Sequence, residues 1–451
     1  MNYFTNLFVV SGAKISAKLS AKFGKLLLLL IVFLLSCNIT NALPSYARQT
    51  GMSCSACHFS FPELNSFGRQ FKMNGYVLTG MTSIEAKDDS NKVTKLKLLS
   101  TLPLSAMVQS SFTHIAKDVP GTQNNSVTLP QQLSVFYAGQ ITPHIGTFIQ
   151  MTYDGHSFGM DNVDIRYANQ TRIGSTGLVY GLTLNNNPAV QDVWNTSPAW
   201  RFPSAGSDAA KTPAKSSIME NLGSQVAGLG AYTLWNNLIF AEVTLYRSAQ
   251  QGAANPADSS SAMVVHGVAP YWRLALQHQW YNNYIAVGTF GIAPRLYQTG
   301  TSGPMSKFRD IAFDAQYEHT LPFGALSFHG SYTHETETRD FVTYSGRIVN
   351  KEYDFNTLKV DGNLYLKNGL GATLGYFYTQ GSKDENVGSW SSRPDSNGFI
   401  AQLEYLPWYN TKFALQYVAY NKFDGTIMNY DSNGRNAADN NTLYLVVWLN
   451  F

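Results

Sequence analysis

The sequence predicts an all-β protein: a transmembrane antiparallel β-barrel of about 16 strands, with a small, partly helical N-terminal segment as its plug. From about residue 96 onward, segments of roughly ten residues with alternating polarity follow one another. The chain of 451 residues contains 26 Tyr, 26 Phe and 36 Gly, which suits many short strands joined by turns. Its last segment alternates up to an aromatic terminal residue, Phe451. With 44% apolar and 14% charged residues, the composition excludes a disordered chain.

Residues 1–42 have the pattern of an export signal. Four lysines, the last being Lys25, precede the unbroken apolar run Leu26–Leu35. Ten residues are too short for a bilayer span, which needs roughly 20 in helical form. We expect cleavage after Ala42; the alternative is a lipoprotein signal ending at Cys37. Removal of the four lysines leaves a nearly neutral chain, and nothing in its charge points to nucleic acid.

A c-type haem attachment motif follows the signal, because residues 54 to 58 have the sequence Cys-Ser-Ala-Cys-His. Two thiols at this spacing can add to the two vinyl groups of one porphyrin, and the adjacent His58 then binds the iron. A cysteine pair in an oxidising compartment would otherwise indicate a disulfide. Of the three alternatives to haem, a zinc site lacks a second pair of ligands, and a thioredoxin-like pair lacks a βαβ context. The third is a chance match, but this one lies shortly after an export signal, where haem attachment takes place. We expect one covalent haem on Cys54 and Cys57, with His58 as proximal ligand.

The residues after the motif predict a short helix. Ser60-Phe61-Pro62-Glu63 has the form of a capping box, Leu64, Phe67 and Phe71 recur at helical spacing, and Gly75 supplies a stop. This aromatic stripe packs either against the porphyrin or against protein. The sequence leaves both alternatives open.

The second axial ligand of the iron is poorly determined by the sequence. Met73 is the nearest candidate beyond the helix, whereas Met52 lies too close to the attachment site to reach round. His114, other histidines and an open site are the alternatives. A methionine would raise the reduction potential relative to a second histidine.

The remainder of the chain has the dyad pattern of a membrane barrel. In the segment 162–167, Val163, Ile165 and Tyr167 are expected to face lipid, and Asp164 and Arg166 to face the lumen. The predicted strands are 103–114, 131–141, 145–154, 161–169, 176–186, 224–234, 238–248, 268–279, 283–294, 308–319, 324–335, 352–366, 370–379, 397–407, 411–421 and 442–451. Sixteen is an even number, as closure of bacterial single-chain barrels requires, and leaves an aqueous lumen. The polar gaps 186–223 and 249–266 are expected to be extracellular loops.

The organisation expected is therefore a signal peptide (1–42), a haem segment with its linker (43–95) and the barrel (96–451). The haem segment is too short to build a core of its own. We expect it to lie inside or across the barrel mouth, joined to it by the polar stretch Glu85–Lys95. Three acids, Asp154, Asp161 and Asp164, are candidate lumen ligands for a metal cation, or general pore lining.

The haem segment resembles the N-terminal signature of the fused outer-membrane monohaem cytochrome–porins. The likeness covers roughly residues 44 to 76, and it rests on Pro44-Ser45-Tyr46-Ala47-Arg48-Gln49-Thr50-Gly51, the haem motif, Phe61-Pro62, Phe67-Gly68-Arg69, Phe71-Lys72 and Gly75-Tyr76. The resemblance implies one haem c, a barrel of about sixteen strands and a place in the bacterial outer membrane. It also implies that Arg48 and Gln49 contact a haem propionate or lock the plug.

Several members of that family are regarded as ferrous-iron oxidases, so the resemblance implies an iron-oxidising electron conduit. The expected partners are outer-membrane lipid, extracellular Fe(II) or another redox partner, and a periplasmic c-type cytochrome or other soluble carrier. The expected activity is that of an Fe(II):cytochrome oxidoreductase. Two alternatives stay open: a diffusion porin with a structural or gating haem segment, and outward electron transfer to an extracellular acceptor.

Overall fold

The structure is a computed structural model. It describes residues 44–78, 83–85, 97–99, 101–153, 155, 157–194, 210, 213, 215–249, 263–298, 300–344 and 346–451. The predicted export signal, including both Cys37 and the cleavage position after Ala42, lies outside these residues. So do Asp154 and most of the predicted linker.

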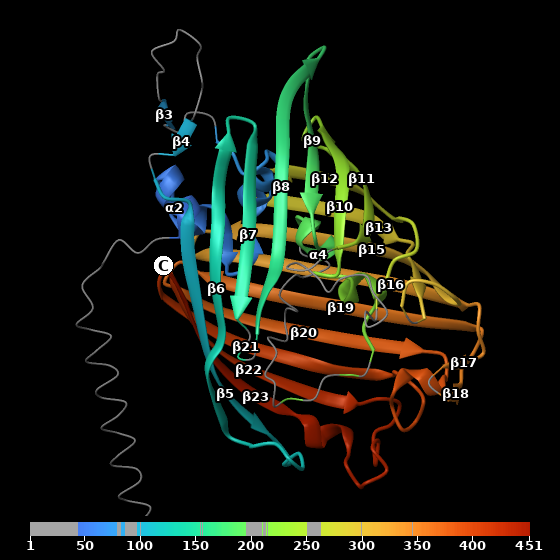
Figure 1. Ribbon diagram of the computed structural model, residues 1–451. Helices are drawn as coiled ribbons and strands as arrows, with labels where there is room; N and C mark the ends of the chain where they lie inside the picture. The colour runs from blue at the N-terminus through green and yellow to red at the C-terminus, as the bar shows by residue number, and fades with distance from the viewer. Residues whose placement is uncertain are drawn as a thin grey trace, which may run out of the picture. The chain divides into compact units, whose positions relative to one another are not determined.

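The described strands form a closed antiparallel barrel (Figure 1). Sixteen strands make up its wall: β5 (Leu104–Ile115), β6 (Ser126–Thr142), β7 (Ile145–Tyr153), β8 (Phe158–Ile173), β9 (Thr176–Asn185), β10 (Val226–Trp235), β11 (Ile239–Ser248), β12 (Ala269–Trp280), β13 (Asn283–Ile292), β15 (Met305–Leu321), β16 (Gly324–Arg339), β19 (Glu352–Leu366), β20 (Leu370–Gly381), β21 (Ser396–Trp408), β22 (Thr411–Lys422) and β23 (Thr442–Asn450). The short β14 (Arg295–Tyr297) extends β13 along β15, and β23 pairs with β5 to close the ring. The predicted fold class, number of strands and order are confirmed.

The barrel wall is apolar outside and polar inside. Along β8, Asn162, Asp164 and Arg166 are buried toward the lumen, while the alternate residues are more exposed, as predicted. The same alternation gives exposed large hydrophobic side chains on most strands, among them Leu182, Leu229, Val243, Leu274, Leu374 and Leu403. Because lipid is the only medium that favours such an outer face, the protein is an outer-membrane barrel. Among the described helices, none is long and apolar enough to cross a bilayer.

The two ends of the barrel differ in their connections. At one end the strands are joined by two or three residues, and at the other by longer segments. Exposed aromatic side chains gather at the short turns: Trp235, Trp280, Tyr281, Phe323, Trp408, Tyr409 and Phe451. Short turns mark the periplasmic end of such barrels, whose apolar band has an aromatic girdle at each interface. The C-terminus and the N-terminal helix lie together at this end (Figure 1).

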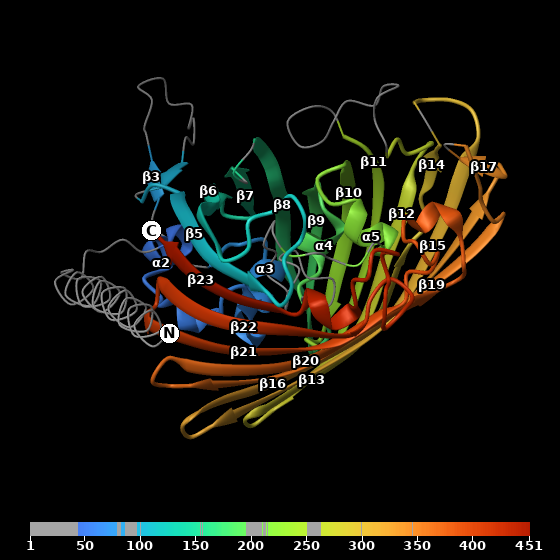
Figure 2. The ribbon, with the colours of Figure 1, turned by 90° about the horizontal axis from the view of Figure 1, so that it is seen from below.

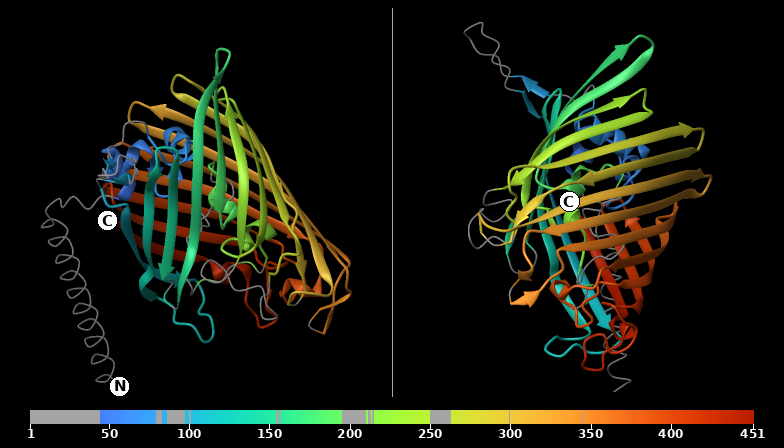
Figure 3. Two further views of the ribbon diagram at one scale, coloured as in Figure 1. Left: turned by 45° about the horizontal axis from the view of Figure 1, so that its top comes forward. Right: turned by 90° about the vertical axis from the view of Figure 1, so that its right-hand side faces the viewer.

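The N-terminal segment lies within the ring of strands (Figures 2 and 3). It consists of α2 (Ser45–Thr50), η1 (Cys54–Ala56), β1 (His58–Ser60), β2 (Glu63–Leu64) and α3 (Ser66–Met73), and is called the plug below. Beyond it, β3 (Ser83–Glu85) pairs with β4 (Lys97–Leu99). The predicted capping box is wrong. Ser60 and Glu63 pair in the small sheet β1–β2, and Asn65 caps α3 by accepting from the Gly68 amide at 2.9 Å.

The plug is attached to the wall on several sides. On the β6–β7 side, the Ser45 hydroxyl donates to the Ala138 carbonyl at 2.6 Å, and Tyr46 donates to the Thr147 carbonyl at 2.5 Å. On β15, the Arg69 Nη1 lies 2.6 Å from the Glu318 carboxylate. The Lys412 ammonium on β22 donates to Ser60 and to the carbonyl of Phe61. The barrel wall therefore buries the plug residues, as the small size of the plug predicts.

The gap 186–223 is not a simple extracellular loop. Its described ends form α4 (Pro188–Gln191), which is buried throughout, and α5 (Ile218–Asn221), which buries Ile218 and Met219. They contact lumen-facing side chains: the hydroxyl of Thr244 on β11 donates a hydrogen bond to the Gln191 side chain. The Ile218 amide likewise donates to Glu335 on β16. These apolar helix residues avoid water by folding inward, and they narrow the lumen above the plug.

η2 (Glu385–Val387), η3 (Ala437–Asn440) and the hairpin of β17 (Thr343–Tyr344) and β18 (Arg347–Ile348) belong to connections at the long-loop end.

Candidate functional site

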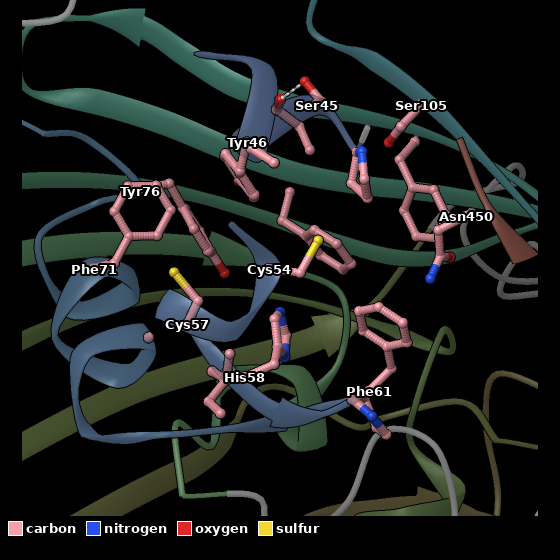
Figure 4. A pocket seen from close by; sticks show the side chains of 18 of the residues that line it. Ser45, Tyr46, Cys54, Cys57, His58, Phe61, Phe71, Tyr76, Ser105 and Asn450 are labelled. Atoms are coloured by element: carbon pink, nitrogen blue, oxygen red, sulfur yellow. Dashed lines mark hydrogen bonds between the residues drawn. The ribbon is translucent and has the colours of Figure 1, made fainter. Parts of the chain in front are cut away.

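A hollow lies between the plug and the wall at the periplasmic end (Figure 4). The space between the atoms around it amounts to about 1440 Å³, which includes open solvent, so the hollow is a partly open cavity and not a sealed one. The lining comes mainly from the plug and the first and last strands, and includes Cys54, Cys57, His58, Phe61, Phe67, Phe71, Tyr46, Tyr76, Met107, Phe136, Phe148, Trp448 and Asn450.

Both motif thiols and the imidazole meet this hollow (Figure 4). Cys54 and Cys57 are not joined in a disulfide, and both are partly buried. Burial raises the pKa of both thiols, that of Cys57 to about 11 with a further contribution from Cys54. The thiols are thus neutral, reduced and directed at one cavity, which is the arrangement that addition to two vinyl groups needs.

The imidazole of His58 is held in the state that a metal ligand requires. Its Nδ1 lies 3.2 Å from the backbone carbonyl of Glu63, so Nδ1 carries the hydrogen and donates it. The lone pair is then on Nε2, which is the tautomer usually fixed by a backbone carbonyl in metal sites. Burial lowers the pKa of His58 to about 4, so the ring is neutral at neutral pH. The residues present therefore fit a covalently held haem.

The local fold keeps the motif against α3. Asn65 donates its backbone amide to the Cys57 carbonyl at 2.9 Å and its side-chain amide to the Ala56 carbonyl at 3.0 Å. Gly68 in α3 faces the same carbonyl so closely that an added Cβ would lie 2.2 Å from the Cys57 oxygen. Only glycine allows this approach of helix and motif.

We expect Gly68→Ala to displace α3 from the motif, because the clash is with backbone that has no rotamer to change. The loss should be about 1–3 kcal/mol in plug stability, seen as faster amide exchange across 44–78 and reduced haem content. Gly177→Ala is the matched control, since a Cβ there meets nothing within 4 Å. Equal exchange in both variants would contradict the close approach.

The predicted aromatic stripe faces the hollow. Leu64, Phe67 and Phe71 all line it, and the Phe71 ring meets Tyr46 edge-on with centroids 5.1 Å apart. Tyr46 in turn stacks on Tyr76, with centroids 5.7 Å apart. The stripe therefore lines the hollow and also packs against other aromatic side chains of the chain, which leaves both alternatives open.

Arg48 and Gln49 face the wall instead of the hollow. Arg48 donates to the backbone carbonyl of Leu104 at the start of β5. Gln49 donates to the Ala138 carbonyl at 2.8 Å, and neither residue is among those that line the hollow. Of the two roles expected for this pair, these contacts perform the locking of the plug.

Met73 does not reach the hollow. Its side chain is 1% exposed and packs with Val179, Trp194 and Tyr232 on the other side of α3. His114 lies on β5 with its Nδ1 bonded to Asn125, also away from the lining. The prediction that places Met73 on the iron has no support from this arrangement, because Phe67, Gly68 and Phe71 of α3 line the cavity and Met73 projects from another face of the helix.

The predicted lumen acids are engaged with neighbouring side chains. Asp164 pairs with Arg166 at 2.8 Å and accepts from Tyr76 of the plug at 2.6 Å. Asp161 accepts from Thr152 at 3.2 Å. Within the described part of the chain, no three His, Cys, Asp or Glu side chains are grouped to hold a metal ion. Asp161 and Asp164 are therefore general lining of the pore, and Asp164 also contacts the plug.

The residues that the barrel wall contributes to the hollow were not predicted from the sequence. Met107 on β5, Phe136 on β6, Phe148 on β7 and Trp448 on β23 contribute to the hollow from strands far apart in sequence. A usable signal existed: each is a large apolar residue at a position where the dyad pattern expects a lumen-facing polar side chain. Such exceptions mark the part of the wall against which the plug or a bound cofactor packs.

No protein-family model matches the chain, and no curated protein matches it in sequence. Solved structures with a similar strand arrangement include outer-membrane proteins. In-vitro folded OmpT of Vibrio cholerae shares 11% identity over 78% of this chain and 97% of that one, with a TM-score of 0.41. An anion-selective porin from Comamonas acidovorans shares 10% over 77% and 98%, with a TM-score of 0.44. At such values these chains give no information on what this one binds. Its own geometry defines a plugged, porin-like outer-membrane barrel.

Proposed function

We propose that the protein transfers single electrons at the outer membrane through one haem c bound covalently to Cys54 and Cys57, with His58 on the iron. Its donor would be extracellular, with Fe(II) as the favoured species, and its acceptor a soluble periplasmic carrier. The observation that carries the proposal is the convergence of two reduced thiols and an oriented neutral imidazole on one apolar hollow. The likeness to fused cytochrome–porins supports it independently.

When bound, the haem would supply a one-electron couple, and a single haem suits Fe(II) better than a two-electron donor. The chain's own residues perform the other tasks. His58 is oriented by the Glu63 carbonyl, and the thiols fix the haem edge. Phe61, Phe67 and Phe71 exclude water from the cavity and lower its polarity.

The position of the hollow suits delivery to the periplasm. It lies at the short-turn end of the barrel, and its rim carries the exposed Met52 and Phe67, each 37% exposed. A donor outside the cell is separated from it by α4, α5 and the buried ion pairs of the lumen, such as Arg273 with Asp314 at 2.7 Å.

The test is direct. Mass spectrometry of the purified protein should show one covalently added porphyrin. Addition of Fe(II) should then reduce the haem iron. The His58→Ala variant should keep the added mass but lose the reduction. A wild-type polypeptide without the porphyrin mass, or a haem that stays oxidised with Fe(II), would defeat the proposal. A midpoint potential well below that of the Fe(III)/Fe(II) couple would favour outward transfer instead.

A diffusion porin is the second candidate, and a specific observation favours it. Sixteen strands with a polar inner face are the construction of pores with an aqueous channel. Measured solute flux or steady ion conductance through reconstituted holoprotein would support this function. The plug contacts predict a low conductance for the intact protein.

A further inference from the structure

The site described above leaves the second axial ligand of the proposed haem iron unassigned. The residues that line the hollow limit which side chains can supply it. Among its lining residues, His58 is the one histidine. Apart from His58 and the two thiols, the lining side chains with a thioether, amine or phenol group able to bind iron are Met52, Met107, Lys72, Tyr46 and Tyr76.

Three of these five side chains are committed elsewhere. The Lys72 ammonium donates to the Val190 carbonyl of α4. The Tyr46 hydroxyl donates to the Thr147 carbonyl at 2.5 Å, and the Tyr76 hydroxyl donates to Asp164 at 2.6 Å. Each contact holds the plug to the lumen, so turning any of these groups to the iron would break an attachment. The two methionines remain.

Met52 is a poor choice because of where the chain carries it. One residue separates it from Cys54, whose thiol would be bonded to the porphyrin edge, and its side chain is 37% exposed at the rim. Reaching the face opposite His58 would require the chain to pass round the porphyrin within two residues.

Met107 comes from the wall and is one of the residues that line the hollow. Its side chain is 1% exposed, and its sulfur accepts a hydrogen bond from the Gln109 side-chain amide at 3.7 Å. A thioether is a weak acceptor, so this contact is easier to give up than those of Lys72 and the two tyrosines. Residues 105 and 107 project from the same face of β5, because side chains alternate along a strand. Figure 4 shows Ser105 on the side of the hollow opposite His58. A strand also positions a ligand more rigidly than the rim loop does.

We propose that Met107 is the second axial ligand of the iron, so that the haem joins the plug through His58 to the barrel through β5. The inference rests on the proposed haem. Ligation by a thioether favours the reduced iron and raises the potential relative to a second histidine. A raised potential makes the haem a stronger acceptor of electrons from a donor such as Fe(II).

The experiment compares wild type with Met107→Leu, which conserves volume, and with Met52→Leu and Met73→Leu as matched controls. Each sample is first checked for the porphyrin mass. We expect iron X-ray absorption of wild type to show one sulfur neighbour. Met107→Leu should lose it, shift the midpoint potential downward and bind added imidazole at least tenfold more tightly. Both controls should match wild type. Met107→His should restore a six-coordinate spectrum at low potential.

The outcomes separate the two proposals. Absence of the porphyrin mass from wild type would overturn the haem itself. A haem that is present, with no sulfur neighbour in wild type, would overturn Met107 alone, and this measurement needs no variant to fold. Loss of the sulfur in Met52→Leu or Met73→Leu, with Met107→Leu unchanged, would also overturn it.

Discussion

Replacing Arg69 by Met should loosen the plug and open an ion path through the barrel. The Arg69 guanidinium lies 2.6 Å from the Glu318 carboxylate, and the two side chains are 1% and 6% exposed. It also lies 4.4 Å over the ring of Tyr284. Removal of one member of a buried pair leaves an uncompensated charge and costs about 3–5 kcal/mol. The barrel keeps its own strand pairing, so the loss is expected in the attachment of the plug.

Single-channel recording of the reconstituted variant, together with limited proteolysis of residues 44–78, measures this release. We expect conductance to rise several-fold and cleavage to accelerate. Lys307→Met is the matched control. Its partner Asp340 lies 3.0 Å away, but the pair is 47% and 40% exposed and contributes about 0–1 kcal/mol. Adding Glu318→Leu to Arg69→Met should restore a closed plug, because no charge is then stranded. Conductance equal to wild type in Arg69→Met would refute the attachment.

The barrel was predictable from the sequence because every strand carries its own signal. Alternation of lipid-facing and lumen-facing residues is local, so Asp164 and Arg166 could be assigned to the lumen before any partner was known. Turn positions were equally local, since the short periplasmic connections leave little freedom. All sixteen predicted strands overlap the observed ones.

The plug was predictable only in part. The haem motif and the end of the helix at Gly75 depend on adjacent residues. The contacts of the plug with the wall, in contrast, join positions up to hundreds of residues apart. Glu63 illustrates the limit: the pattern Ser60 to Glu63 suggested a helix cap, but the carboxylate is used by strands β16 and β19. A buried carboxylate takes the strongest donors available, and those donors belong to the wall. The inward fold of α4 and α5 escaped prediction for the same reason.

Glu63 should therefore matter more than any local pattern implies. Its carboxylate accepts from the Ser327 hydroxyl at 2.6 Å and from the Tyr365 hydroxyl at 2.5 Å. His329 lies 3.4 Å from it and is held by Asp361 at 2.9 Å on the other side. The backbone carbonyl of Glu63 is also the acceptor for His58, so one residue anchors β2 to the wall and orients the proximal ligand.

We expect Glu63→Ala to leave these wall donors without an acceptor, at about 1–3 kcal/mol for each unsatisfied group. Because β2 then loses its anchor, the orientation of His58 changes, and both amide exchange across 44–78 and the haem midpoint potential should respond. Glu63→Gln keeps one acceptor oxygen in the same shape and should recover part of both signals. Glu352→Ala, at an exposed position of β19, is the control and should stay within about 0.5 kcal/mol of wild type. A merely structural anchor would change exchange but leave the potential of the folded fraction untouched, so a shifted potential in Glu63→Ala distinguishes positioning of the ligand from simple support of the plug.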